Sequence, residues 1–142
     1  MQKFFISQQA AWIKDGKCLI VESAKSPGYF GLPGGRINIG EQQDVAFARE
    51  LKEELNLDKF EKLAVCDYLA FYDVPSGRHL ENPVCAVISL IKSEQEATNN
   101  DPVENSQHVW VSEDEINNYK YYCYNLDQSI KKAFVIYNSL YK

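Results

Sequence analysis

Three glutamates within one helical turn are the residues of this sequence best suited to chemistry. Glu50, Glu53 and Glu54 stand at positions i, i+3 and i+4, so on a helix of about 100° per residue their side chains share one face. Like charges at this spacing destabilise a bare helix by about 0.2–0.5 kcal/mol per pair, and a helix that keeps them close needs a positive partner. A hard divalent cation is such a partner.

The surrounding residues predict the elements that must position these carboxylates. Residues 42–55 place Ala48, Leu51 and Leu55 away from the glutamates, which indicates an amphipathic helix. Residues 31–40 contain four glycines and a proline, which predicts a loop with short extended pieces. Such a loop can bring main chain close to an ion because glycine has no Cβ.

The spacing of charged residues and glycine around this helix resembles the signature box of the Nudix hydrolases. Its fixed positions, spread over residues 35–57, are Gly35, Glu41, Arg49, Glu50, Glu53, Glu54 and an aliphatic Leu57. The one departure is Asn56, where the family pattern has glycine. Asparagine is the next most tolerant residue of the left-handed conformation that a helix C-terminus often needs, so the change is physically mild.

The resemblance implies an α/β fold, a Nudix-type α/β/α sandwich with a mixed sheet between helices. The β-rich runs and turn signals of the chain predict strands over residues 3–13, 17–23, 63–74, 83–92 and 108–111, a capping box at 112–115 and a C-terminal helix over 126–140. No repeat or linker divides the sequence, and 142 residues suit one domain spanning residues 1–142.

In the Nudix family the box carboxylates bind the metals, which here implies Glu50, Glu53 and Glu54. The backbone carbonyl of the first box glycine, Gly35, often joins them. The expected ion is Mg²⁺, with Mn²⁺ as the alternative, because these ions take carboxylate and carbonyl oxygens. The general base differs between subfamilies, and Glu53, Glu54 and a loop glutamate all stay open for that role.

Arg49 is expected to brace the site rather than to touch substrate. In the Nudix family this arginine ties the box glutamates together, so the resemblance implies that Arg49 holds Glu41 and the metal glutamates. That role is physically sensible, because a guanidinium fork can pair with two carboxylates; outer metal ligand is the alternative role of Glu41. Nudix enzymes often complete the site with an acidic residue on the loop before the last strand. Glu104 is the first choice, Asp101 the second and Glu81 the third. Residues expected to serve catalysis are therefore Glu41, Arg49, Glu53, Glu54 and Glu104.

Four residues outside these carboxylates are candidates for substrate binding. Arg36 and Arg78 could each reach a phosphate, although a solvated surface position is as good an interpretation for both. Phe30 could stack on a base, but packing is the commoner role of an aromatic residue in a strand. Tyr72 lies near the distance beyond the box at which dinucleoside polyphosphate members carry a tyrosine.

Composition restricts the partners. A net charge of −5 and only three arginines argue against binding long nucleic acid through its phosphates. No stretch approaches the 18 apolar residues of a membrane span, and the N-terminus lacks a signal-peptide core, so we expect a cytoplasmic protein.

The four cysteines are isolated from one another and are expected to be buried free thiols. The tyrosines of residues 119–124 are expected to pack or to form a partner surface, which leaves a homodimer open.

The resemblance implies a pyrophosphatase that hydrolyses the diphosphate linkage of a small nucleoside diphosphate derivative. Nucleoside triphosphates, nucleotide sugars and dinucleoside polyphosphates fit this description equally. The alternative is a Nudix-fold regulator that binds a nucleotide without cleaving it. Such proteins typically lose one or more box glutamates, and this chain retains all of them.

Overall fold

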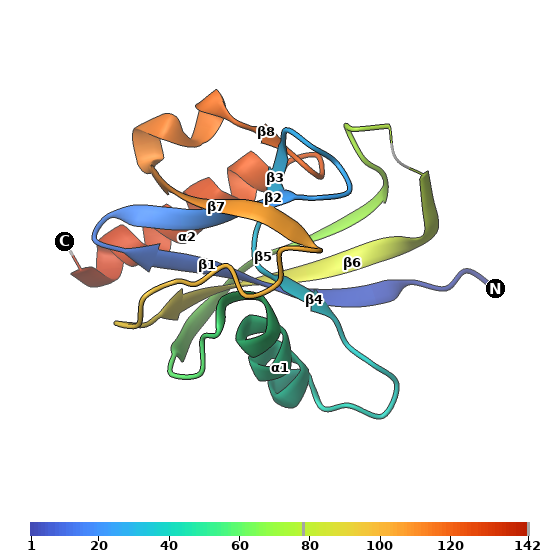
Figure 1. The fold of residues 1–142 in the computed structure, drawn as a ribbon, viewed down its shortest axis with the longest axis horizontal. Helices are drawn as coiled ribbons and strands as arrows, with labels where there is room; N and C mark the ends of the chain where they lie inside the picture. The colour runs from blue at the N-terminus through green and yellow to red at the C-terminus, as the bar shows by residue number, and fades with distance from the viewer. Residues whose placement is uncertain (78, 142) are drawn as a thin grey trace.

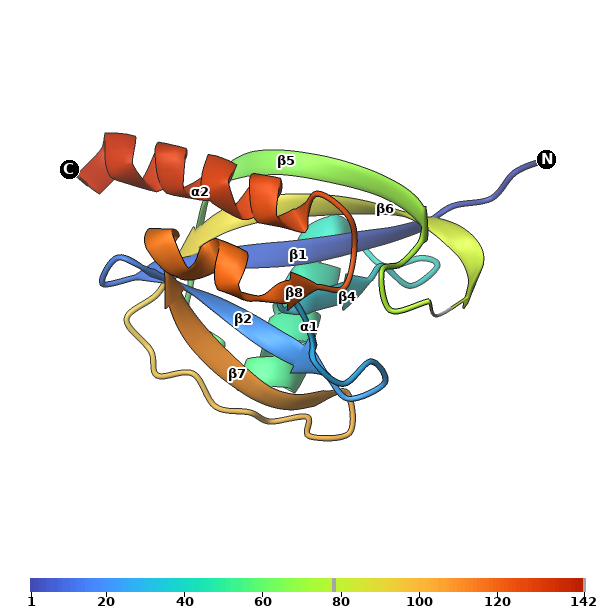
Figure 2. The same cartoon turned by 90° about the horizontal axis from the view of Figure 1, so that it is seen from above.

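In the computed structural model, which describes residues 1–77 and 79–141, one curled mixed sheet carries helices on different sides (Figures 1 and 2). Its strands are β1 (Phe5–Lys14), β2 (Lys17–Ser23), β3 (Tyr29–Gly31), β4 (Gly34–Arg36), β5 (Glu61–Asp73), β6 (His79–Lys92), β7 (Asn105–Ser112) and β8 (Lys120–Tyr121). The helical segments are α1 (Gln43–Leu55), the 3₁₀ turn η1 (Glu113–Asn118) and α2 (Leu126–Tyr141). The expected α/β fold with a mixed sheet between helices is confirmed.

Strand β1 is the centre of the sheet, because β2, β4 and β6 all pair with it directly. It runs parallel to β6 and antiparallel to β4, and its last residues pair with β2 across the Asp15-Gly16 turn. The outer strands continue the order β5-β6-β1-β2-β3-β8, with β7 on β2. In the β4 ladder Gln9 lies opposite Gly34 and Gln8 opposite Gly35. This register fixes the glycines of the box against the middle of β1.

The alternation of side chains along β1 divides the interior into two cores. Ala10 and Trp12 point toward α1 and pack with Phe47 and Leu51, while Ala11 and Ile13 point the other way into the core under α2. That second core takes Ile130, Ala133 and Phe134 from the helix. Successive strand residues face opposite sides of a sheet, so one strand positions both helices (Figure 2).

Most expected elements are present, with two differences at the strands. Strand β6 begins at His79, four residues before the strand expected over residues 83–92. The reason is that Asp73 pairs with His79 across a tight turn that includes Gly77 at φ +79°, so a polar segment joins the ladder. The two-residue strand β8 was not predicted. The capping box is confirmed, since the Ser112 N–H donates to Glu115 Oε1 at 3.0 Å.

The loop after β6 and the cysteines complete the description. Residues 93–104 are held by hydrogen bonds to α1 and to the β1–β2 turn. The contacts are Lys14 Nζ to the carbonyls of Glu94 and Gln95, the Thr98 N–H to the Leu55 carbonyl and the Asn100 N–H to the Glu54 carbonyl. All four cysteines are free thiols, two of them buried. Among the described residues, no helix combines the length and apolarity needed to cross a membrane.

Candidate active site

Helix α1 presents the three glutamates because its other side is buried. Phe47, Leu51 and Leu55 lie in the core, which leaves the carboxylate face directed toward β4. The helix ends at Asn56, whose backbone is left-handed at φ 53° and ψ 31° and whose N–H donates to the Lys52 carbonyl at 3.0 Å. The expectation that asparagine replaces the family's glycine in this conformation is confirmed.

Arg49 lies at the centre of the carboxylates and contacts three of them. Its Nε and Nη2 donate to the two oxygens of Glu41 at 2.7 and 3.0 Å. Its Nη1 donates to Glu50 at 2.9 Å and to Glu53 at 3.3 Å. The guanidinium hydrogen bonds hold the pKa of Glu41 below its ordinary value, and burial raises the pKa of Glu50 despite the arginine. This arrangement suits a bracing role.

Glu54 is turned away from Arg49 and is held by two other groups. Its Oε2 accepts the Gly34 N–H at 2.6 Å, and its Oε1 accepts Nδ2 of Asn105 at 3.1 Å. Burial raises the pKa of Glu54 to about 7, and the nearby carboxylates of Glu50 and Asp101 act in the same direction. Asn105, at the start of β7 and buried, is a site residue that sequence reasoning missed. No box motif includes it, and only the β2–β7 pairing brings it to the helix.

Gly35 provides space that one carboxylate fills. A Cβ built on this residue would overlap the carboxylate of Glu50, so the Glu50 side chain lies directly against the main chain of β4. Gly34 is equally constrained for another reason. Its φ is +145°, and a Cβ there would overlap the backbone of β1, including Gln9 Cα at 2.8 Å. The two glycines therefore allow helix, turn and strand to approach one another closely.

The donor set around Gly35 fits a hard divalent ion in its chemistry. Three carboxylates and a main-chain carbonyl are the oxygen ligands that Mg²⁺ prefers, and the absence of a Cβ at Gly35 opens one side of Glu50. Within the described residues, however, no three acidic, histidine or cysteine side chains already converge on one point. Glu50 and Glu53 point at Arg49, and Glu54 points at Gly34. Holding an ion would therefore require these side chains to rotate.

A cavity of about 330 Å³ opens beside Gly35 and contains the expected loop glutamate. Glu104 lines it together with Arg36 and Lys25, and Lys25 Nζ lies 3.7 Å from Glu104 Oε1. Asp101 lies near Glu54 and accepts the Glu104 N–H at 3.3 Å. Glu81 is exposed on β6 and does not line this cavity. Of the three acidic candidates beyond the box, Glu104 has the most open route to a ligand.

The three candidate substrate-binding residues that the structure describes are not gathered in one place. Arg36 lines the cavity while its guanidinium stacks 3.8 Å from the centre of the Phe5 ring. Phe30 is only 7% exposed and meets Tyr119 edge to face, a placement that suits packing rather than base stacking. Tyr72 is exposed on β5, where its hydroxyl accepts a hydrogen bond from Gln2 Nε2 at 2.9 Å. Arg78 lies outside the described residues.

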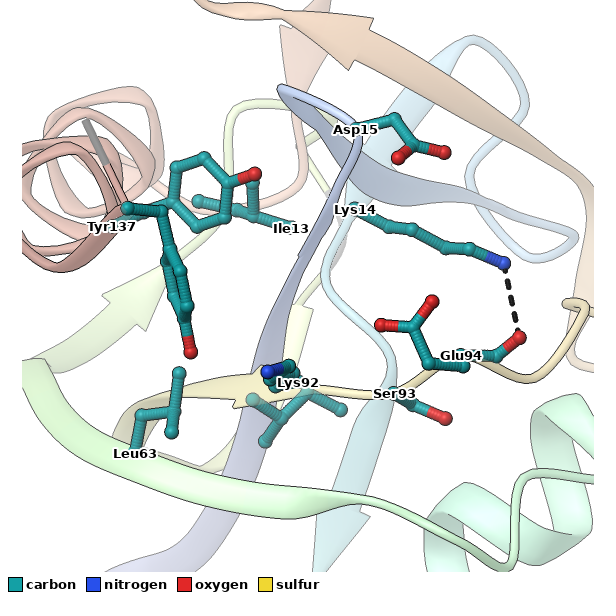
Figure 3. A pocket seen from close by; sticks show the side chains of 10 residues that line it. Ile13, Lys14, Asp15, Leu63, Lys92, Ser93, Glu94 and Tyr137 are labelled. Atoms are coloured by element: carbon teal, nitrogen blue, oxygen red, sulfur yellow. Dashed lines mark hydrogen bonds between the residues drawn. The ribbon is translucent and has the colours of Figure 1, made fainter.

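A separate cavity of about 230 Å³ lies at the far end of β1, between the sheet and α2 (Figure 3). Its wall includes Ile13, Lys92 and Tyr137. Ile13 is four residues beyond Gln9, which is about 13 Å along an extended strand. Lys14 Nζ donates a hydrogen bond of 3.2 Å to the Glu94 carbonyl, which Figure 3 marks with a dashed line. None of the box carboxylates lines this cavity.

Comparison with known proteins agrees with this geometry. No curated protein sequence matches the chain. A MutT protein from Methanosarcina mazei is similar in structure, with a TM-score of 0.76 at 20% identity over 96% of each chain. A MutT NUDIX hydrolase from Burkholderia pseudomallei gives 0.73 at 20% identity, over 92% of this chain and 98% of its own. An ADP-ribose pyrophosphatase from Streptococcus suis gives 0.71 at 22%, over 95% and 92%.

These structural likenesses establish the fold, and a sequence comparison establishes the family. The NUDIX domain model matches residues 8–131, a span that includes the whole box and every strand that holds it. The chain is therefore a member of the Nudix family.

Proposed function

We propose that this chain hydrolyses the diphosphate linkage of a small nucleoside diphosphate derivative with Mg²⁺, or alternatively Mn²⁺, held by the box. One observation carries the proposal: Glu50 and Glu53 pair with Arg49, Glu54 is held by Gly34, and the next residue, Gly35, lines an open cavity. When bound, the metal would neutralise phosphate oxygens and acidify the attacking water. The carboxylates of these glutamates and the Gly35 carbonyl would hold it.

The remaining residues of the cavity would position the substrate. Arg36 and Lys25 offer positive charge where a diphosphate would enter, and Arg36 can keep its stacking on Phe5 while its free edge donates to phosphate. Glu104 stands on the same wall with its side chain half exposed. From there its carboxylate can accept a proton from a water aligned with the phosphorus. Arg49 stays behind the carboxylates and fixes their rotamers.

The alternative function, nucleotide binding without cleavage, has less support. A protein that only binds has no need for an arginine fork that orders metal ligands, yet the partly exposed Arg49 makes contacts of 3.4 Å or less to Glu41, Glu50 and Glu53. The two functions differ in one measurement, because a regulator would bind nucleotide tightly and release no product.

A substrate panel with Mg²⁺ tests the proposed function directly. It should include nucleoside triphosphates, nucleotide sugars, dinucleoside polyphosphates and ADP-ribose, with phosphate read after a coupled phosphatase or pyrophosphatase. We expect at least one substrate to be cleaved, the activity to disappear on chelation, and Mg²⁺ or Mn²⁺ to restore it. Binding without cleavage of any substrate would favour the regulator instead.

Replacing Arg49 with lysine should weaken the apparent affinity for Mg²⁺ and the rate together. Lysine keeps the charge but cannot pair with both oxygens of Glu41 and also reach Glu50, and lost support of metal ligands typically costs about 10- to 100-fold. The measurement is the Mg²⁺ dependence of kcat at saturating substrate. Arg36→Lys is the matched control and should leave that dependence unchanged, because Arg36 contacts no box carboxylate. An unaltered Mg²⁺ curve for Arg49→Lys would remove the brace from the mechanism.

Replacing Glu104 with glutamine should lower kcat by about 10- to 100-fold while KM changes only a few-fold. The carboxylate is placed to act on water rather than to bind the ground-state substrate. Asp101→Asn is the comparison variant and should have a much smaller effect, because its amide oxygen can still accept the Glu104 N–H. If the ranking of the two variants is reversed, the role belongs to Asp101. If neither changes kcat, the base lies on α1.

A further inference from the structure

A second, smaller pocket of about 180 Å³, called the inner pocket here, adjoins the cavity beside Gly35, which is called the outer cavity. The two share the side chains of Gln9, Ser23, Glu104 and Tyr122. The outer part is polar and carries Arg36 and Lys25. The inner part lies against Leu32, Cys123 and Leu126, which are buried apolar residues. A ligand filling both would place an anionic group outside and a flat or apolar group inside.

Gln9 is the shared residue with an unmet hydrogen-bonding need. Its Oε1 is sealed from solvent and accepts no hydrogen bond, a state found for only one other buried side-chain atom in the described residues, His108 Nδ1. Leaving a buried acceptor unpaired costs about 1–3 kcal/mol. The neighbouring glutamine differs, since Gln8 Nε2 donates to the Gln43 carbonyl at 2.6 Å on the α1 side. The terminal torsion of glutamine is broad, so a small rotation turns the Gln9 amide toward a ligand.

We propose that Gln9 reads the base of the substrate and thereby sets specificity, an inference that rests on the proposed pyrophosphohydrolase function. A glutamine amide carries a donor and an acceptor side by side, which matches a nucleobase edge where an amino group stands beside a ring nitrogen. The inner pocket has apolar side chains for the ring faces, and Tyr122 adds an aromatic edge there. Phe71, which packs edge to face on Tyr122, lines the outer cavity. The diphosphate then extends outward to Gly35.

The position of Gln9 in the sheet supports this role. Its Cα is opposite Gly34 on the neighbouring strand β4, and the Gly34 N–H donates a hydrogen bond to Glu54. Only strand β4 therefore separates Gln9 from the carboxylate face of α1. An alkyl diphosphate in the same cavity would leave the Gln9 oxygen unpaired. A nucleobase with a free amino group would satisfy it, and discrimination of about 1–3 kcal/mol corresponds to about 5- to 150-fold in kcat/KM.

Four ribonucleoside triphosphates, their four nucleoside diphosphate sugars and one base-free alkyl diphosphate provide the test. For the parent we expect at least a 10-fold spread of kcat/KM among the four bases. Gln9→Met keeps the length of the side chain but removes both hydrogen-bonding groups, so it should reduce that spread to a few-fold. Gln9→Glu offers only acceptors, so it should shift preference toward guanine, which presents two adjacent donors.

Gln8→Met is the matched control, because Gln8 lies next in the strand but faces α1. It should keep the parent's ranking of bases and melt at a lower temperature, since it loses a hydrogen bond. Gln9→Met should melt at or above the parent's temperature. A parent without base preference, a Gln9→Met variant with the parent's ranking, or cleavage of the alkyl diphosphate alone would overturn the role of Gln9. If the protein cleaves none of these compounds and no substrate of the wider panel, the proposed function itself is wrong.

Discussion

Glu54→Gln should lower kcat by at least about 100-fold in a protein that remains folded, since about 3 kcal/mol of lost transition-state stabilisation gives this factor. The amide is isosteric with the acid but carries no charge and only one acceptor oxygen. That oxygen can keep the Gly34 N–H, and Asn105 can turn its own amide to accept from the new NH₂ group. The buried hydrogen bonds are thus retained while the metal-binding charge is lost.

The measurement is kcat for the best substrate of the panel at saturating Mg²⁺, with circular dichroism and a thermal melt to check the fold. Glu96→Gln makes the same chemical change on a side chain that is 95% exposed and paired only with Lys14 at 3.7 Å. It should retain the parent's kcat. Parent-like turnover by Glu54→Gln would show that this residue holds no metal that the reaction needs.

Gly35→Ala should abolish most activity, by about 100-fold or more, with little loss of stability. The added methyl group would overlap the Glu50 carboxylate, but that carboxylate is the far end of a flexible side chain and can move aside. The fold therefore tolerates the change, whereas Glu50 no longer lies against β4. Displacing a functional group by about 1 Å can cost about 100-fold in rate. We expect a lower kcat and a weaker Mg²⁺ dependence at an almost unchanged melting temperature.

Gly34→Ala supplies the contrast, because the same substitution one residue earlier meets backbone. Its Cβ would overlap main-chain atoms of Gln8 and Gln9, and the φ of Gly34 is +145°. The overlap could be relieved only by moving the backbone of β1 or of β4. This variant should lose folding stability. Gly77→Ala controls for positive φ alone, since its Cβ would meet no atom within 4 Å, and should cost about 1–2 kcal/mol. If Gly35→Ala unfolds as readily as Gly34→Ala, then Gly35→Ala also strains the backbone, and its loss of activity cannot be assigned to displacement of the Glu50 carboxylate.

Local sequence was sufficient for helix α1 and for the residues it displays. The 3.6-residue period indicates which side of a helix is apolar, and it placed Leu51 and Leu55 in the core with the glutamates opposite. The third residue of the expected apolar stripe, Ala48, is exposed, and the core takes Phe47 instead. The substitution of Asn56 for glycine was also interpretable, because the need for a left-handed backbone at a helix end is a property of a few adjacent residues. The pairing of Arg49 with Glu41 was predicted from the resemblance to the family, and the structure has it in two hydrogen bonds, as a guanidinium fork and a carboxylate allow.

Residues that reach the site from distant segments were decided by the tertiary structure. Asn105 meets Glu54 across 51 positions of sequence, and nothing in its neighbours marks it as different from any polar residue at a strand start. Its place follows from the pairing of β7 with β2. Phe30 likewise is an aromatic residue that could stack on a base, yet the elements packed around it place it in the core. Long-range register, which sets these contacts, has no local signature.

The sequence by itself determined the family, the carboxylate face of α1 and the chemistry that such a face can support, because those depend on spacing within one element. The tertiary structure decided that Arg49 pairs with Glu41, Glu50 and Glu53. It directed Glu54 instead toward Gly34 and Asn105. It also decided which of two adjacent glutamines faces a cavity, since Gln8 and Gln9 are identical in type and differ only in the side of β1 on which they fall. Side-chain direction in a strand alternates by residue, so only the fixed register of β1 against β4 and β6 settles it.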